Sequence, residues 1–318
     1  MYSPYLFARG SELLALRDMV DKQVNVDCLM PILEPVKSDT KALLKCLNVW
    51  GGNGSKAIVI CNPLQIDFHE NEKNVQTLNA DLDELFKIYP SLIRGFVVSS
   101  AASKNEIDKF ISNANGSKVA LIYNNPSLDN AEFNSVIQNQ SVIYHVVLND
   151  KVTLAQKAII PPQKFIPVND CFNKLARNAD YGPPEPFSDL YKQIGISCIG
   201  VGDYTITGKV LEITGGLPSA VAAHLIYKNL SNNNVWVEHF VSDDVERQDS
   251  DVATKYLQMA KKIVSRVSVN RNMFGTNIAL VYYADSVKNS YFPGLPKNKE
   301  YQMIHHMCLM MDVITGTI

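Results

Sequence analysis

Short apolar segments recur along the first 200 residues, and each ends in polar residues. They run over 28–34, 56–62, 93–99, 118–124, 142–149, 164–169 and 196–202. Near-continuous apolar runs of this length are typical of strands that are buried on both faces. The segments between them carry apolar residues at helical spacing, as at Leu78, Leu82 and Leu85. The pattern therefore predicts seven strand–helix units that form a parallel sheet.

Seven units of one polarity favour a closed barrel over an open doubly wound sheet, although right-handed crossovers allow both. The Gly-x-Gly-x-x-Gly motif does not follow the first apolar segment, and the chain contains no Gly-x-x-x-x-Gly-Lys-Ser/Thr motif. These are the signatures of dinucleotide-binding folds and P-loop NTPases, so both classes lose support. We predict an α/β fold with a TIM-like (β/α)8 barrel.

The eighth unit departs from this pattern. Two β-rich segments, 218–227 and 235–241, flank an asparagine-rich turn and predict a β-hairpin in place of the eighth strand–helix unit. We expect one arm of this hairpin to close the barrel, and the pattern does not decide which arm. Helical spacing then continues to the C-terminus.

These boundaries predict a single domain over residues 1–318. Within it we expect an N-terminal cap helix at 1–23, the barrel at 24–245, and a helical C-terminal part at 246–318 that packs on the barrel.

Composition narrows the class of protein. Hydrophobic residues make up 46% of the chain, and 30 Lys+Arg against 32 Asp+Glu give a formal net charge of -2. Proteins that bind nucleic acid through broad electrostatic attraction usually have a basic excess, so direct nucleic-acid binding is not expected. The six cysteines form no Cys-x-x-Cys pair and mostly lie in apolar segments, which predicts free thiols in a reducing compartment. No signal peptide or membrane-spanning segment is evident, so we expect a cytoplasmic protein.

Polar residues follow the predicted strands, and this predicts a site. In a (β/α)8 barrel the carboxyl ends of the strands converge on one mouth, where such folds do their chemistry. Three carboxylates at these ends, Glu34, Asp170 and Asp203, are candidate catalytic acids, bases or metal ligands. Candidate ligand-binding residues are Lys37, Asn62, Asn124, Asn149, Arg177, Asn178 and Asp180. The competing interpretation is that strands simply end in turn-forming polar residues. The cofactor stays open, with a divalent metal ion as one candidate.

The longest irregular loop follows the sixth apolar segment, from Asp170 to Asp189. Loops of this length are often lids or recognition loops, and we expect this one to cover the barrel mouth. Arg177 would then clamp a phosphate or carboxylate; the alternative is a structural ion pair with Asp180.

A series of short motifs occurs in a specific order along the chain: Tyr2–Tyr5, Arg9–Arg17, Pro31–Val36, Asn62–Pro63, Arg177–Tyr181, Phe187–Asp189, Gly202–Tyr204, His239–Asp243 and Phe292–Leu295. Together they resemble the Beta protein family of bacterial and phage proteins, and the resemblance extends over nearly the whole chain. The family members that this chain resembles most tend to be encoded beside a restriction-endonuclease-like protein. The resemblance therefore implies a role in defence against phage and a partner of that kind. It implies no catalytic residues.

Three hypotheses follow from the sequence. The first is a component of a phage-defence module that binds a ligand or partner protein at the barrel mouth. The second is a metal-dependent barrel hydrolase that acts on a phosphoester, and the third is an inert structural subunit. A metal site needs oxygens that converge on one ion at ~2.0–2.6 Å. A closed network of hydrogen bonds or ion pairs would instead favour a binding or scaffold role.

Overall fold

The computed structural model describes residues 1–318 except 213–215 and 217. The sequence predicted one domain, whereas the chain divides into two compact units. The first comprises Met1–Asp170 and Lys192–Tyr204, and the second comprises Cys171–Tyr191 and Thr205–Ile318. The chain therefore leaves the first unit twice, after Asp170 and after Tyr204.

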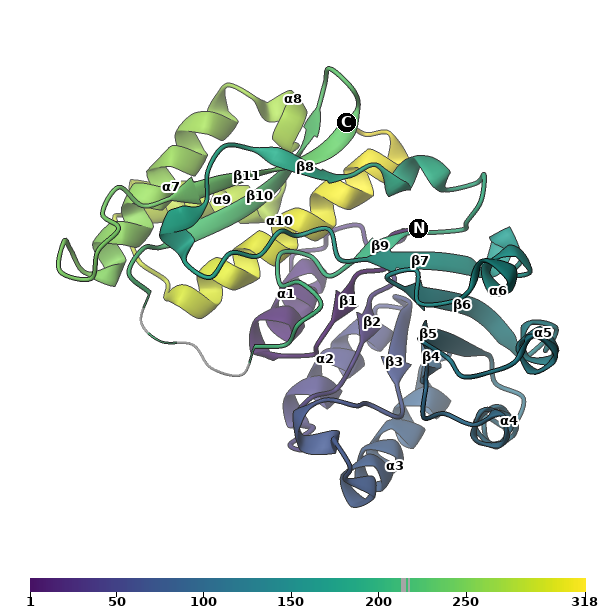
Figure 1. Cartoon of the computed structure of the whole chain (residues 1–318). Coiled ribbons are helices and arrows are strands. Elements are labelled where there is room, and N and C mark those ends of the chain that lie inside the picture. Colours follow the sequence, from purple (N-terminus) through teal and green to yellow (C-terminus); the bar gives the residue numbers. More distant parts are fainter. Residues whose placement is uncertain (213–215, 217) are drawn as a thin grey trace. The chain divides into compact units, whose positions relative to one another are not determined.

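The first unit is an eight-stranded parallel sheet that curves into a TIM-like barrel, which confirms the predicted fold class (Figure 1). The strands follow one another in the order β1 (Tyr5–Leu6), β2 (Ile32–Leu33), β3 (Ala57–Ile60), β4 (Leu92–Ser99), β5 (Val119–Asn124), β6 (Val142–Leu148), β7 (Phe165–Asn169) and β9 (Gly202–Asp203). Tyr2 forms parallel bridges to both Leu29 and Val201, so it joins the two edges of the sheet.

Helices lie outside this sheet, as the alternating pattern predicted (Figure 1). They are α1 (Gly10–Asp21), α2 (Lys41–Gly52), α3 (Glu72–Ile88), α4 (Lys104–Asn113), α5 (Asn130–Ile137) and α6 (Leu154–Ala158), with 3-10 turns η1 (Ile66–Phe68) and η2 (Pro162–Lys164). Leu78, Leu82 and Leu85 form the buried face of α3. Helix α4 begins with a capping box, in which Ser103 and Glu106 each accept a hydrogen bond from the other's backbone N–H.

The barrel differs from the predicted one at both ends. Segment 1–23 is not a cap helix: β1 and α1 form the first strand–helix unit. The hairpin does form, from β10 (Ala222–Asn229) and β11 (Asn234–Val241), but it pairs with β8 (Glu185–Ser188) in a separate antiparallel sheet. The prediction that one arm closes the barrel over 24–245 is therefore wrong. The N-terminal strand already occupies the eighth position.

The second unit packs helices on this three-stranded sheet. Its helices are α7 (Val252–Ser268), α8 (Arg271–Phe274), α9 (Ile278–Lys288) and α10 (Leu295–Thr315), with 3-10 turns η3 (Asn178–Asp180) and η4 (Leu190–Gln193), the last of which runs across the unit boundary. Leu225, Tyr227 and Phe240 of the hairpin form a core with residues of α7, α8 and α9. In the part of the chain that the structure describes, no helix combines the length and the apolar character that a membrane crossing requires.

Candidate functional site

The pleat of the barrel strands decides which side chains face the interior. Phe96 of β4 points outward, because its ring packs against helix α4. Its neighbour Gly95 therefore points inward, and a side-chain carbon added there would lie 2.7 Å from Ile58 of β3. Ile58 pairs with Ile32 of β2, so Ile32 faces inward as well. Glu34 lies two residues further along and has the same orientation.

Glu34 is held by protein donors on both of its oxygens. The residue is 2% exposed. The Tyr5 hydroxyl donates to Oε2 at 2.6 Å, and the backbone N–H of Leu64 donates to Oε1 at 3.1 Å. Burial raises the pKa of Glu34, although both hydrogen bonds act in the opposite direction. Burial, followed by the nearby Glu34 carboxylate, raises the pKa of the Tyr5 hydroxyl.

Tyr204 extends this cluster toward strands β6 and β7. Its ring centroid lies 5.1 Å from that of Tyr5, at an angle of 42°. The Asn149 side-chain amide donates to the Tyr204 hydroxyl at 3.4 Å, and its Oδ1 accepts the backbone N–H of Asp170 at 2.8 Å. Burial is also the main cause of the raised pKa of Tyr204. The structure thus brings Glu34, Asn149 and the Asp170 backbone around two tyrosines, and we call these five residues the mouth cluster.

Asp203 does not join the mouth cluster. It precedes Tyr204 directly, so the pleat directs the two side chains to opposite faces of β9. Asp203 is 2% exposed and accepts a hydrogen bond from the Tyr2 hydroxyl at 2.8 Å. The prediction that Asp203 faces Glu34 across the barrel mouth therefore needs correction, because strand ends converge but alternate residues do not point the same way.

The Asn62 side chain is hydrogen-bonded to the backbone of the neighbouring strand β4. Its side-chain amide donates to the carbonyl oxygen of Val97 at 3.0 Å and accepts the Val97 backbone N–H at 2.7 Å. The side chain therefore continues the β3–β4 ladder by one step. Lys37 and Asn124 are exposed. Neither has a side-chain contact that ties it to the mouth cluster among the described interactions.

Substitution of Asn62 tests this role. We expect Asn62→Ala to lower the free energy of unfolding by about 2 kcal/mol, because the Val97 N–H and C=O both lose their partner. Asn124→Ala, at an exposed position, should change it by less than about 0.5 kcal/mol. Urea denaturation of both variants measures the difference. An Asn62→Ala protein as stable as Asn124→Ala would contradict the ladder role.

Three predicted ligand-binding residues belong to the second unit. Arg177 forms an ion pair with Glu246 at 3.5 Å, rather than with Asp180 as the alternative proposed. The Asn178 side-chain amide donates to the carbonyl oxygen of Ala220 at 2.8 Å. Asp180 closes a turn, in which its backbone N–H donates to the carbonyl oxygen of Arg177. The lid role of this loop stays a prediction.

Two histidines of the hairpin, which the sequence placed on its two arms, meet in the structure. His224 and His239 pair directly across β10 and β11, and their Nδ1 atoms are 2.9 Å apart. His239 Nε2 lies 3.5 Å from Glu185 Oε1. The Tyr181 ring packs on both imidazoles, with centroid separations of 4.3 and 4.6 Å. Burial lowers the pKa of His224 to about 3.

The described residues contain no cluster of side chains that could form a metal site. Within residues 1–318 apart from the four undescribed positions, no group of three or more His, Cys, Asp or Glu side chains is arranged to hold a metal ion. The three predicted catalytic carboxylates illustrate why. Glu34 is occupied by Tyr5 and Leu64, Asp203 lies on the other face of its strand, and Asp170 contacts Asn149 through its backbone.

Comparison of the sequence with models of known protein families gave no match, and comparison with curated proteins gave none either. The resemblance stated above therefore stays a hypothesis that rests on its motifs.

Sequence reasoning missed Tyr5 and Tyr204, which are the centre of the mouth cluster. Tyr204 follows the last barrel strand directly, so the rule that selected the other strand-end residues also applies to it. Selecting only carboxylates, amides and cations at the strand ends leaves out a tyrosine. Tyr5 was harder to find in this way, because it begins the apolar run Tyr5–Ala8 instead of following it, and this run is shorter than the others.

Proposed function

We propose that this protein is a component of a phage-defence module and that it binds a ligand or a partner protein at the mouth of its barrel. The family-like motifs support the defence context, and they also suggest a restriction-endonuclease-like protein as the partner. We also propose a cytoplasmic location, because its six cysteines are free thiols and suit a reducing compartment.

The binding role rests on one observation: the polar groups of the mouth cluster form hydrogen bonds within the protein. Both Glu34 oxygens accept protein donors, and Asn149 bridges Tyr204 to the next strand. Such a network is rigid and leaves the carboxylate few free positions for a metal ion. Tyr5 and Tyr204 are each only 4% exposed, so a ligand or partner would meet the rim of the mouth and would reach these rings only if the side chains around them moved. This combination favours recognition over the metal-dependent hydrolysis of a phosphoester.

A phage-challenge assay tests the proposal. Cells would carry this gene together with its neighbouring gene, and plaque formation would be compared for the wild-type protein, Tyr5→Phe and Glu34→Gln. Tyr5→Phe removes one hydroxyl, and Glu34→Gln removes the charge at constant shape. We expect both variants to fold and to lose protection, whereas Asn134→Ala, at an exposed position on α5, should protect like the wild-type protein. Full protection by both mouth variants would contradict a functional mouth.

Co-purification tests whether the mouth binds a partner protein or a ligand. A tagged copy of this chain would be isolated with the neighbouring gene's product, before and after infection. If the mouth binds that protein, Glu34→Gln should reduce the yield of the complex. If the yield is the same for wild type and Glu34→Gln while protection differs, the mouth recognises a ligand instead. An inert subunit predicts no effect of Glu34→Gln in either assay.

A further inference from the structure

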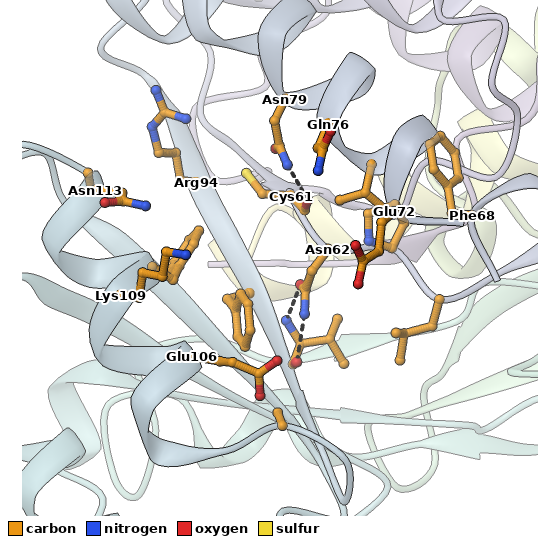
Figure 2. Close-up of a pocket in the computed structure, with 18 of the residues that line it drawn as sticks. Cys61, Asn62, Phe68, Glu72, Gln76, Asn79, Arg94, Glu106, Lys109 and Asn113 are labelled. Carbon is orange, nitrogen blue, oxygen red and sulfur yellow. Dashed lines mark hydrogen bonds between the residues drawn. The ribbon is translucent and has the colours of Figure 1, made fainter. Parts of the chain in front are cut away.

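A groove of about 700 Å³ lies on the outside of the barrel, between helices α3 and α4 (Figure 2). Its lining residues come from the two helices, from β4, and from the segment that follows β3, all within the first unit. The volume is within the range of small-molecule sites, which is ~300–1,000 Å³. Glu34 and the two tyrosines of the mouth cluster are not part of its lining, although Leu64, whose backbone N–H donates to Glu34, is.

Aromatic rings form the apolar part of the groove. Phe96 of β4 and Phe110 of α4 lie with their centroids 4.9 Å apart, and both are only partly buried. They leave ring surface available on which a flat ligand can stack. Amide side chains also line the groove, among them Gln76 and Asn79 of α3 and Asn113 of α4 (Figure 2).

The charge of the lining favours a neutral ligand. Four carboxylates and three cations line the groove, which gives 3 − 4 = −1. Arg94 is already paired with Asp83 at 2.8 Å, and Lys87 is paired with Glu84 at 2.7 Å. Such a surface offers little attraction to a phosphorylated molecule. It offers hydrogen-bonding amides to an uncharged one.

Two residues that line the groove each carry a buried polar atom without a hydrogen bond among the described residues: Arg94 Nε, a donor, and Asn79 Oδ1, an acceptor. The Arg94 guanidinium also interacts with the Cys61 thiol. Asn79 lies one helical turn before Asp83, the residue that is paired with Arg94, so both residues belong to the side of the groove that α3 and β4 form. Leaving such groups buried and unpaired is costly, and a ligand that pairs both would recover the cost.

We propose that this groove binds a nucleobase, as a free base or a nucleoside. The ring would stack on Phe96 and Phe110, and its edge would meet Arg94 and Asn79 when those side chains shift to admit it. A nucleobase combines a flat ring with neighbouring hydrogen-bond donors and acceptors on one edge, and asparagine pairs with such edges in known complexes. This inference goes beyond the binding role of the barrel mouth and does not depend on it.

Titration calorimetry with the full chain tests this proposal. The probes are adenosine, guanosine, cytidine and uridine, each compared with its 5′-monophosphate. We expect at least one nucleoside to bind with one site per chain and a Kd of about 1 mM or tighter, and its monophosphate to bind more weakly. Absence of binding by all four nucleosides would overturn the proposal, as would tighter binding of the monophosphate.

Two conservative variants locate the binding. Phe110→Leu keeps an apolar side chain and removes the ring, and Arg94→Lys keeps the charge opposite Asp83 and removes the Nε donor. We expect each to raise the Kd about 10-fold. Asn105→Ala, on the same helix but outside the groove lining, is the matched control and should bind like the wild-type protein. Melting temperatures verify that the variants fold. Unchanged affinity in Phe110→Leu, the variant least able to disturb the barrel, would overturn the assignment to this groove.

Discussion

Lowering the pH from 7 to 5 should destabilise the second unit by about 4 kcal/mol and the barrel by about 2 kcal/mol, because three buried histidines resist protonation. Burial lowers the pKa of His145 and of His224 to about 3, and that of His305 to about 4. The ordinary pKa of histidine is about 6.5. His145 belongs to the barrel, and the other two belong to the second unit.

The direction follows from which state binds protons. Between pH 6.5 and about 4, the unfolded chain protonates these rings, whereas the folded chain keeps them neutral. The stability they support is therefore complete above pH 6.5 and is lost as the pH falls below it. At pH 5 each ring contributes about 2 kcal/mol to the loss. Burial raises the pKa of Glu34 and of Asp312, and these two carboxyls act in the opposite direction.

The surroundings of each ring explain why a proton is excluded. Besides burial, the positive charge of Lys164 lowers the pKa of His145. The Nδ1 atom of His145 is hydrogen-bonded to the Tyr123 hydroxyl at 2.9 Å. His224 lies against His239, and a second proton in that pair would place two cations in contact. Both rings lie inside packed surroundings, where an added charge has little solvent to stabilise it.

Urea denaturation at pH 8, 7, 6 and 5 measures the effect. Fluorescence and circular dichroism would follow the two units, and we expect the second to unfold first as the pH falls. If His145→Gln removes this contribution, the uptake of protons on unfolding of the barrel between pH 7 and pH 5 should fall by about one proton. A free energy of unfolding that is constant from pH 7 to pH 5 would contradict the prediction.

The alternating pattern of the sequence was sufficient for the barrel because each parallel strand is buried on both faces and is followed by a helix. It failed for β1, because the apolar run around this strand, Tyr5–Ala8, is only four residues long, and this gap left the eighth position unassigned. The hairpin was then placed there. Its own pattern was correct, but a pattern of alternation does not say which sheet a hairpin joins. Its partner, β8, lies inside the loop that the sequence predicted as a lid.

The candidate site, like the fold, could be predicted only in part. The rule that strand ends converge selected Glu34, Asn149 and Asp170, and the structure brings them around Tyr5 and Tyr204. That they bind a ligand stays a prediction. It failed for Asp203, because adjacent residues of a strand point to opposite faces. It could not foresee that Asn62 would bond to the backbone of Val97, since such a contact depends on the register between two strands.

Gly202→Ala should destabilise the barrel by about 3 kcal/mol or prevent it from closing. Gly202 begins β9, the strand that meets the N-terminal segment. A side-chain carbon added there would lie 2.0 Å from the carbonyl oxygen of Ser3 and 2.9 Å from a methyl group of Val168. The Ser3 oxygen belongs to the backbone, and the Ser3 N–H is itself bonded to the carbonyl oxygen of Val201 at 2.8 Å. The clash therefore cannot be relieved by a side-chain rotation.

The effect should be confined to the closure of the barrel. Strands β1 and β9 each span two residues, so few hydrogen bonds join the edges of the sheet, and a displaced Ser3 would break the bond to Val201. Hydrogen exchange should show lost protection at the Ser3 amide in the variant, while amides of β10 and β11 exchange as before. Gly52→Ala is the control, because its added carbon meets open space at the end of α2. If Gly202→Ala unfolds at the same urea concentration as Gly52→Ala, the N-terminal segment does not close this barrel.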